Sequence, residues 1–152
     1  MIIVFGVDGS IQSRHAIREA ARLLPLKQAR LFAVAVASVP PIPVDVMPGG
    51  MGSAGISVQT ALLEQAEKAS LRVLAEARGL FLELGLEATT VERLGSPAEE
   101  VLALAHEVQA DLIVVGAHSY GPLERFWRGS VSDQVAHRAP GAVLVVHLPA
   151  GC

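Results

Sequence analysis

Five strand-like runs alternate along the chain with segments of helical periodicity, and this alternation limits the folds open to it. The runs span residues 1–7, 29–38, 87–94, 110–116 and 141–148. Most are almost continuously aliphatic, which is typical of parallel strands buried on both faces. The pattern predicts an α/β protein with a single domain over 1–152, built on a five-stranded, parallel, doubly wound, Rossmann-like sheet.

The segments between the runs carry the signals of helices and loops. Ser10 or Ser13 is placed to cap a first helix, and Ser96-Pro97 with acidic residues after it is typical of another helix start. Residues 39–57 contain four prolines and four glycines. We expect this stretch to be a long mobile loop without regular structure, and such loops are usually functional or disordered.

Composition excludes several classes of protein. The net charge is −3 and the basic residues are scattered, which argues against nucleic-acid binding. Mean hydropathy is high at +0.46, yet no apolar run approaches the ~20 residues of a membrane helix. The first residues lack the basic region of a signal peptide. A single cysteine excludes an internal disulfide, and these features together lead us to expect a cytoplasmic protein.

Three loops are expected at the carboxyl edge of the sheet, where open parallel sheets bind ligands. They begin at Asp8, at Val36 and at Gly116, and they converge if the first and fourth strands are central neighbours. Asp8 has two interpretations. It is placed to accept hydrogen bonds from a ribose or help hold a cation, or it caps the turn and first helix that follow.

The segment after the fourth strand favours an anion. Gly116 leaves room for a close approach, and Gly129-Ser130-Val131-Ser132 opens a helix whose free N–H groups and dipole attract phosphate. A simple turn and N-cap explains the same residues equally well. The chain contains neither the G-x-x-x-x-G-K-[ST] pattern of a P-loop nor G-x-G-x-x-G.

Two long segments carry a resemblance to a known family. They are "GSPAEEVLALAHEVQADLIVVGAHS" and "GPLERFWRGSVSDQVAHRAPGAVLVV", together with "VDGSIQSRHAIREAARLL" near the start. With these, nearly the whole chain resembles a universal stress protein domain. The resemblance implies a five-stranded, adenine nucleotide alpha hydrolase-like fold, homodimers joined through the last strand (142–148), and in some members a nucleotide crevice.

The ATP-binding members of that family carry G-x-x-G, nine residues, then G-[ST]. The resemblance implies nucleotide-binding roles for Asp8, Val36 through its backbone, Gly116, Gly129, Ser130, Val131 and Ser132. Ser119 stands where the second glycine belongs. If that position has a positive φ, a serine there costs of order 1 kcal/mol or more. Gly121 is placed to absorb the turn, and His118 either faces a phosphate or lies exposed in the loop.

These observations lead to a first hypothesis and an alternative. We expect a homodimeric regulatory module of the stress response that binds an adenine nucleotide, preferably ATP, with Mg²⁺ or Mn²⁺ accompanying the phosphates. No catalytic residues and no metal ligands of the protein are identified, so any hydrolysis is expected to be slow. The alternative is a nucleotide-free dimeric scaffold of the same fold, which Ser119 favours. We expect no nucleic-acid or membrane partner.

Overall fold

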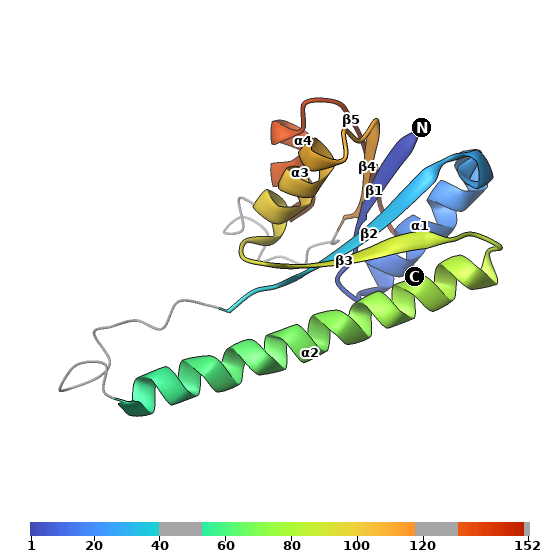
Figure 1. Cartoon of the computed structure of the whole chain (residues 1–152). Coiled ribbons are helices and arrows are strands. Elements are labelled where there is room, and N and C mark those ends of the chain that lie inside the picture. Colours follow the sequence, from blue (N-terminus) through green and yellow to red (C-terminus); the bar gives the residue numbers. More distant parts are fainter. Residues whose placement is uncertain (40–52, 118–130, 151–152) are drawn as a thin grey trace.

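The computed structural model describes residues 1–39, 53–117 and 131–150. Strands and helices alternate through these ranges (Figure 1). The strands are β1 (Ile2–Gly6), β2 (Arg30–Ala37), β3 (Ala88–Leu94), β4 (Leu112–Gly116) and β5 (Ala142–Val146). The helices are α1 (Ile11–Leu23), α2 (Ser53–Glu83), α3 (Pro97–Glu107) and α4 (Val131–Arg138), with a 3₁₀ turn η1 at Leu26–Gln28.

The strands form one parallel sheet in the order β3-β2-β1-β4-β5. This confirms the predicted α/β fold, with β1 and β4 as central neighbours. The order reverses between β1 and β4, because the chain moves outward to β3 and then returns past β1. Open sheets bind ligands at such a reversal, beyond the carboxyl ends of the strands.

Helices cover both faces of the sheet (Figure 1). Alternate residues of β1 divide between two cores, since side chains of a strand point to opposite faces. Ile3 and Phe5 pack with α1 and α2, where the Phe5 and Phe81 rings meet edge to face at 5.1 Å. Val4 packs with α3 and α4. Burial on both faces accounts for the high mean hydropathy. None of the helices in the described ranges has the length and apolarity of a membrane span.

Helix α2 begins earlier than the sequence indicated. It starts at Ser53, so the prediction of an irregular segment over 39–57 is wrong for its last residues, and 40–52 lie outside the described residues. The last proline of that segment is Pro48. From Ser53 to Ser57 only Gly55 opposes a helix, at a cost of about 1 kcal/mol. A helix of 31 residues is ~46 Å long and extends past the carboxyl edge of the sheet (Figure 1).

The two outer strands of the sheet are β3 and β5. β3 is the edge next to β2 and carries mostly exposed or half-buried residues. β5 is the opposite edge and pairs in the described structure with β4 alone. The Val146 carbonyl accepts from Ala117 N–H at 2.8 Å. The backbone groups of the even-numbered residues of β5 therefore face β4, and those of the odd-numbered residues face outward.

Candidate functional site

A cavity of about 350 Å³ lies at the carboxyl edge of the sheet, where the strand order reverses. This volume falls at the small end of the range for ligand sites. All the main elements except β3 and β5 contribute to its walls. The lining residues are Gly6, Val7, Asp8, Ser13, Ala35, Val36, Ala37, Ser38, Ala66, Ala69, Ser70, Val73, Pro97, Val101, Val115, Gly116, Val131 and Ser132.

The turn after β1 is held by a network of short polar side chains. Asp8 Oδ1 accepts from the backbone N–H of Ser10 at 2.9 Å and from its hydroxyl at 2.5 Å. Ser10 is the N-cap of α1 and accepts from Ser13 N–H at 3.1 Å. Gly9, between Asp8 and Ser10, has φ +77°, which a residue with a side chain rarely adopts. The capping role considered for Asp8 is therefore present, and its side chain also borders the cavity.

Strand β2 extends beyond its pairing with β1, and within the described residues its backbone groups past that point have no partner in β1. The β1–β2 register ends at Gly6 and Val34, where Val7 N–H donates to the Val34 carbonyl at 2.9 Å. Backbone groups of a strand alternate sides, so Val36 also points toward β1, past the last described bond of that ladder. Ala37 points the other way and accepts from Gly95 N–H at 3.0 Å.

The N–H and C=O of Val36 thus form an adjacent donor and acceptor at the cavity wall. We expected this residue just after the second strand, whereas it lies inside β2 and pairs in register with Arg93. Its backbone reaches the cavity because the neighbouring strand is shorter.

Gly116 is required by the packing of the protein itself. A Cβ at this position would lie 2.6 Å from the backbone carbon and oxygen of Gln12 and 2.9 Å from Ser13 N. The first turn of α1 therefore sits directly against the end of β4. This contact brings Ser13 and Gly116 to the same part of the cavity wall.

The start of α4 forms the wall opposite α2. Val131 is its first residue and half-buried, and Ser132 is 4% exposed; both line the cavity. Of the predicted site residues, His118, Ser119, Gly121, Gly129 and Ser130 lie outside the described residues. The structure does bring together Asp8, Val36, Gly116, Val131 and Ser132.

The α2 wall was not found from the sequence. Ala66, Ala69, Ser70 and Val73 line the cavity one turn apart on a helix that passes the sheet edge. Their spacing is visible in the sequence as ordinary helical periodicity, which indicates a buried face but not what it is buried against. Pro97 and Val101 of α3 were missed for the same reason.

Charge is sparse around the cavity. Asp8 is the one charged side chain among the described residues that line it. The resolved pKa shifts lie in exposed ion pairs elsewhere: hydrogen bonds from Arg93 lower the pKa of Glu107, and those from Arg22 lower the pKa of Glu19. The described residues include no group of three or more His, Cys, Asp or Glu able to hold a metal ion.

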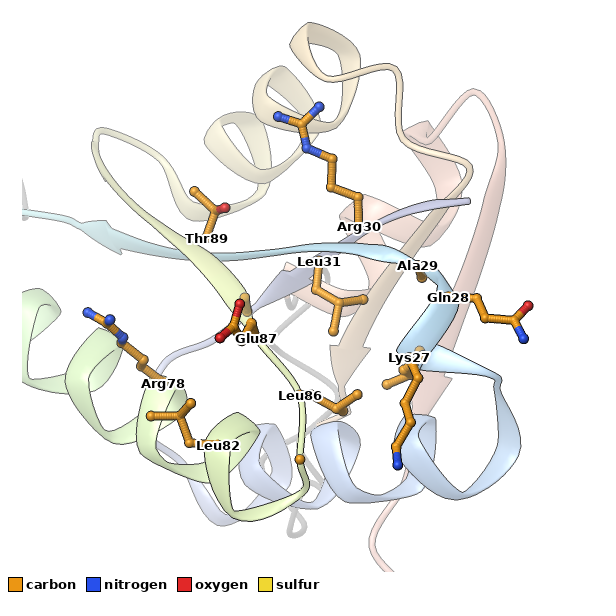
Figure 2. A pocket seen from close by; sticks show the side chains of 13 residues that line it. Lys27, Gln28, Ala29, Arg30, Leu31, Arg78, Leu82, Leu86, Glu87 and Thr89 are labelled. Carbon is orange, nitrogen blue, oxygen red and sulfur yellow. The ribbon is translucent and has the colours of Figure 1, made fainter.

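A larger pocket of about 860 Å³ lies at the opposite, amino edge of β2 and β3. Its polar side chains do not converge: Lys27 and Arg30 point to opposite sides of the start of β2 (Figure 2). Arg30 instead lies over the Phe32 ring at 5.2 Å. The amino edge also lies away from the strand ends where such sheets bind ligands. We therefore take the smaller cavity as the candidate site.

Fold and cavity together define a doubly wound α/β protein with a cavity at its topological switch point. The family model described as the universal stress protein family matches residues 1–147, and the chain belongs to that family. It is 32% identical to universal stress protein MJ0531 of Methanocaldococcus jannaschii, over 97% of this chain and 82% of that protein. It is 30% identical to universal stress protein Sll1654 of Synechocystis, over 95% of this chain and 83% of the relative.

A solved structure extends the comparison to a ligand. A universal stress protein crystallised in complex with cAMP matches with a TM-score of 0.70 and 28% identity, over 98% of both chains. The family predicted from the two long sequence segments is confirmed by these matches.

Proposed function

We propose that this chain binds an adenine nucleotide in the cavity at the carboxyl edge of the sheet. The observation that carries the proposal is the open backbone of Val36. Adenine presents a ring nitrogen that accepts and, beside it, an amino group that donates. The N–H and C=O of one residue in an extended strand are complementary to that pair. The relative crystallised with cAMP supports an adenine ligand for this fold.

The phosphates would lie at the other wall, against the first turn of α4. A helix start offers unpaired N–H groups and the positive end of a dipole. Asp8 would accept from the ribose hydroxyls, because its carboxylate borders the cavity and a carboxylate has about four acceptor positions over its two oxygens. We propose ATP as the preferred ligand, with Mg²⁺ or Mn²⁺ accompanying its phosphates. His118, Ser119, Gly121, Gly129 and Ser130 would complete the site.

The proposed role is that of a cytoplasmic regulatory module of the stress response, in which occupancy by the nucleotide is the signal. Asp8 is the one charged group among the described lining residues, so these residues provide no general base paired with a cation for fast hydrolysis. Any turnover of ATP would be slow.

Isothermal titration with ATP, AMP and ribose 5-phosphate, with and without Mg²⁺, tests the binding proposal. We expect heat from both adenine nucleotides and none from the sugar phosphate, because the base supplies the Val36 contacts. Absence of heat from every nucleotide at about 100 µM protein, or about −5.5 kcal/mol, would refute binding and favour the nucleotide-free scaffold. Ser119→Gly should tighten ATP more than AMP if the serine crowds the outer phosphates.

We further propose that two copies pair through β5. This strand is an aliphatic edge, and its Val143 and Val145 backbone groups face outward. Bare edges of this kind promote pairing, and a two-fold contact of β5 with itself would remove the edge. Light scattering at micromolar concentration should give the mass of a dimer. Val145→Pro, which deletes an outward N–H without touching the β4 ladder, should give a monomer; a wild-type monomer would disprove the pairing.

A further inference from the structure

Ser70 has a buried hydroxyl that already donates its proton in a hydrogen bond within the protein. Its side chain lies in the middle of α2, is 5% exposed, and borders the cavity. The hydroxyl lies 2.9 Å from the Glu67 carbonyl oxygen and 2.5 Å from Glu92 Oε1 on β3. Both neighbours are acceptors, and a hydroxyl has a single proton to give. Whichever acceptor takes it, the proton points away from the cavity.

The oxygen of Ser70 is consequently an acceptor toward anything in the cavity. A hydroxyl oxygen can accept two hydrogen bonds, and no described residue donates one to Ser70 Oγ. Turning the Ser70 hydroxyl so that it donates into the cavity would break the short hydrogen bond to the Glu92 carboxylate. That would be costly, since a hydrogen bond to a charged group is stronger than one between neutral groups. Ser70 therefore selects a ligand group that carries N–H or O–H.

The position of Ser70 identifies which end of the ligand it meets. α2 packs on β2 and β3, whereas α4 starts on the other side of the reversal point, next to α3. A phosphate at the start of α4 leaves the base to reach the wall formed by the end of β2 and by α2. That wall is apolar apart from Ser38, Ser70 and the open Val36 backbone.

We propose that Ser70 is a specificity-determining residue that accepts a hydrogen bond from the exocyclic amino group of the bound base. This inference rests on the proposed nucleotide function. An amino group at the 6-position of a purine has two N–H bonds, of which the Val36 carbonyl takes one and Ser70 Oγ the other. A 6-oxo purine places a carbonyl oxygen against two acceptors. Such a site rejects the wrong base because buried polar groups are left unpaired.

Isothermal titration with three probes tests this role: AMP, IMP, and purine riboside 5′-monophosphate, which has no 6-substituent. Wild type should bind AMP most tightly, the unsubstituted purine more weakly and IMP most weakly, with at least about tenfold between AMP and IMP. Ser70→Ala should weaken AMP about fivefold, the value of one neutral hydrogen bond. It should leave the unsubstituted purine unchanged. Ser70→Cys, which keeps the size of the side chain but is a weak acceptor, is the second variant if alanine disturbs α2.

Ser57→Ala is the matched control, because it removes another hydroxyl from α2 at a position that does not line the cavity. Its ratio of AMP to IMP affinity should stay within about twofold of wild type. An equal loss for all three probes in both Ser70 variants would overturn the role of Ser70 alone. Equal binding of AMP and IMP by wild type would overturn both the Val36 pairing and the role of Ser70. Absence of binding by wild type to every probe would overturn the proposed function and this inference with it.

Discussion

Replacement of Gly116 by alanine should destabilise the protein through a single backbone contact. The added Cβ would lie 2.6 Å from the carbon and oxygen of Gln12 and 2.9 Å from Ser13 N, closer than van der Waals contact allows. These are backbone atoms of the first turn of α1, which cannot rotate away as a side chain would. The strand end and the helix must separate instead.

The expected magnitude follows from two opposing terms. Overpacking of a close contact costs about 1–3 kcal/mol. Alanine recovers about 0.5–1 kcal/mol relative to glycine, because the unfolded chain loses freedom. With backbone on both sides of the clash, we expect a net loss of about 2 kcal/mol, or a fall in Tm of about 4–8 °C for a chain of this size.

Gly79→Ala provides the matched control for the same chemical change. A Cβ at Gly79, within α2, would meet nothing within 4 Å. Alanine in a helix interior is more favourable than glycine by about 1 kcal/mol, so the Tm of this variant should rise by about 2–4 °C. Thermal and urea unfolding followed by circular dichroism measure both variants. A Gly116→Ala protein as stable as wild type, or one that gains like Gly79→Ala, would refute the close packing of α1 on β4.

Two further predictions concern side-chain interactions described above. Asp8→Asn keeps an oxygen that accepts from Ser10 and should leave the unfolding free energy within about 0.5 kcal/mol of wild type. Asp8→Ala removes that acceptor and should lower the unfolding free energy by about 1–2 kcal/mol. Equal unfolding free energies of the two variants in urea would contradict the turn geometry. The pKa of Glu107 is lowered by its hydrogen bonds from Arg93, so this pair stabilises the fold above the unfolded-state pKa and ceases to do so as pH falls through the folded one. Arg93→Gln should return the pKa of Glu107 to its ordinary value, as measured by NMR titration of the carboxyl group. The same Glu107 pKa in wild type and variant would show that the pair does not persist in solution.

The fold could be predicted from the sequence because its strands are buried on both faces. Aliphatic runs such as the one ending at Gly116 are typical of strands buried on both faces, and these occur in parallel α/β sheets. Ser96-Pro97 marks the start of a helix by local signals alone. The prediction of converging loops followed from the rule that parallel strands end at one edge. Asp8, Val36 and Gly116 do meet there.

The parts that were missed depend on distances between elements. The start of α2 at Ser53 was missed because the proline-rich stretch before it gave a composition signal for the whole segment. Ser70 was missed because a serine among apolar helical positions has no local signature of the Glu92 carboxylate that lies 22 residues later in the chain. The open backbone of Val36 arises from the different lengths of β1 and β2, a property of register.

The overhang of β2 beyond β1 also bears on how this site evolves. The proposed recognition of a base through the main chain would not depend on the side chain at position 36, because any residue other than proline keeps the N–H donor and the C=O acceptor. Substitutions at that position would leave the proposed contact with the base unchanged. Insertion or deletion of one residue in β2 would instead turn the opposite backbone groups toward the cavity. Strand length, rather than residue identity, is then the inherited determinant of this contact.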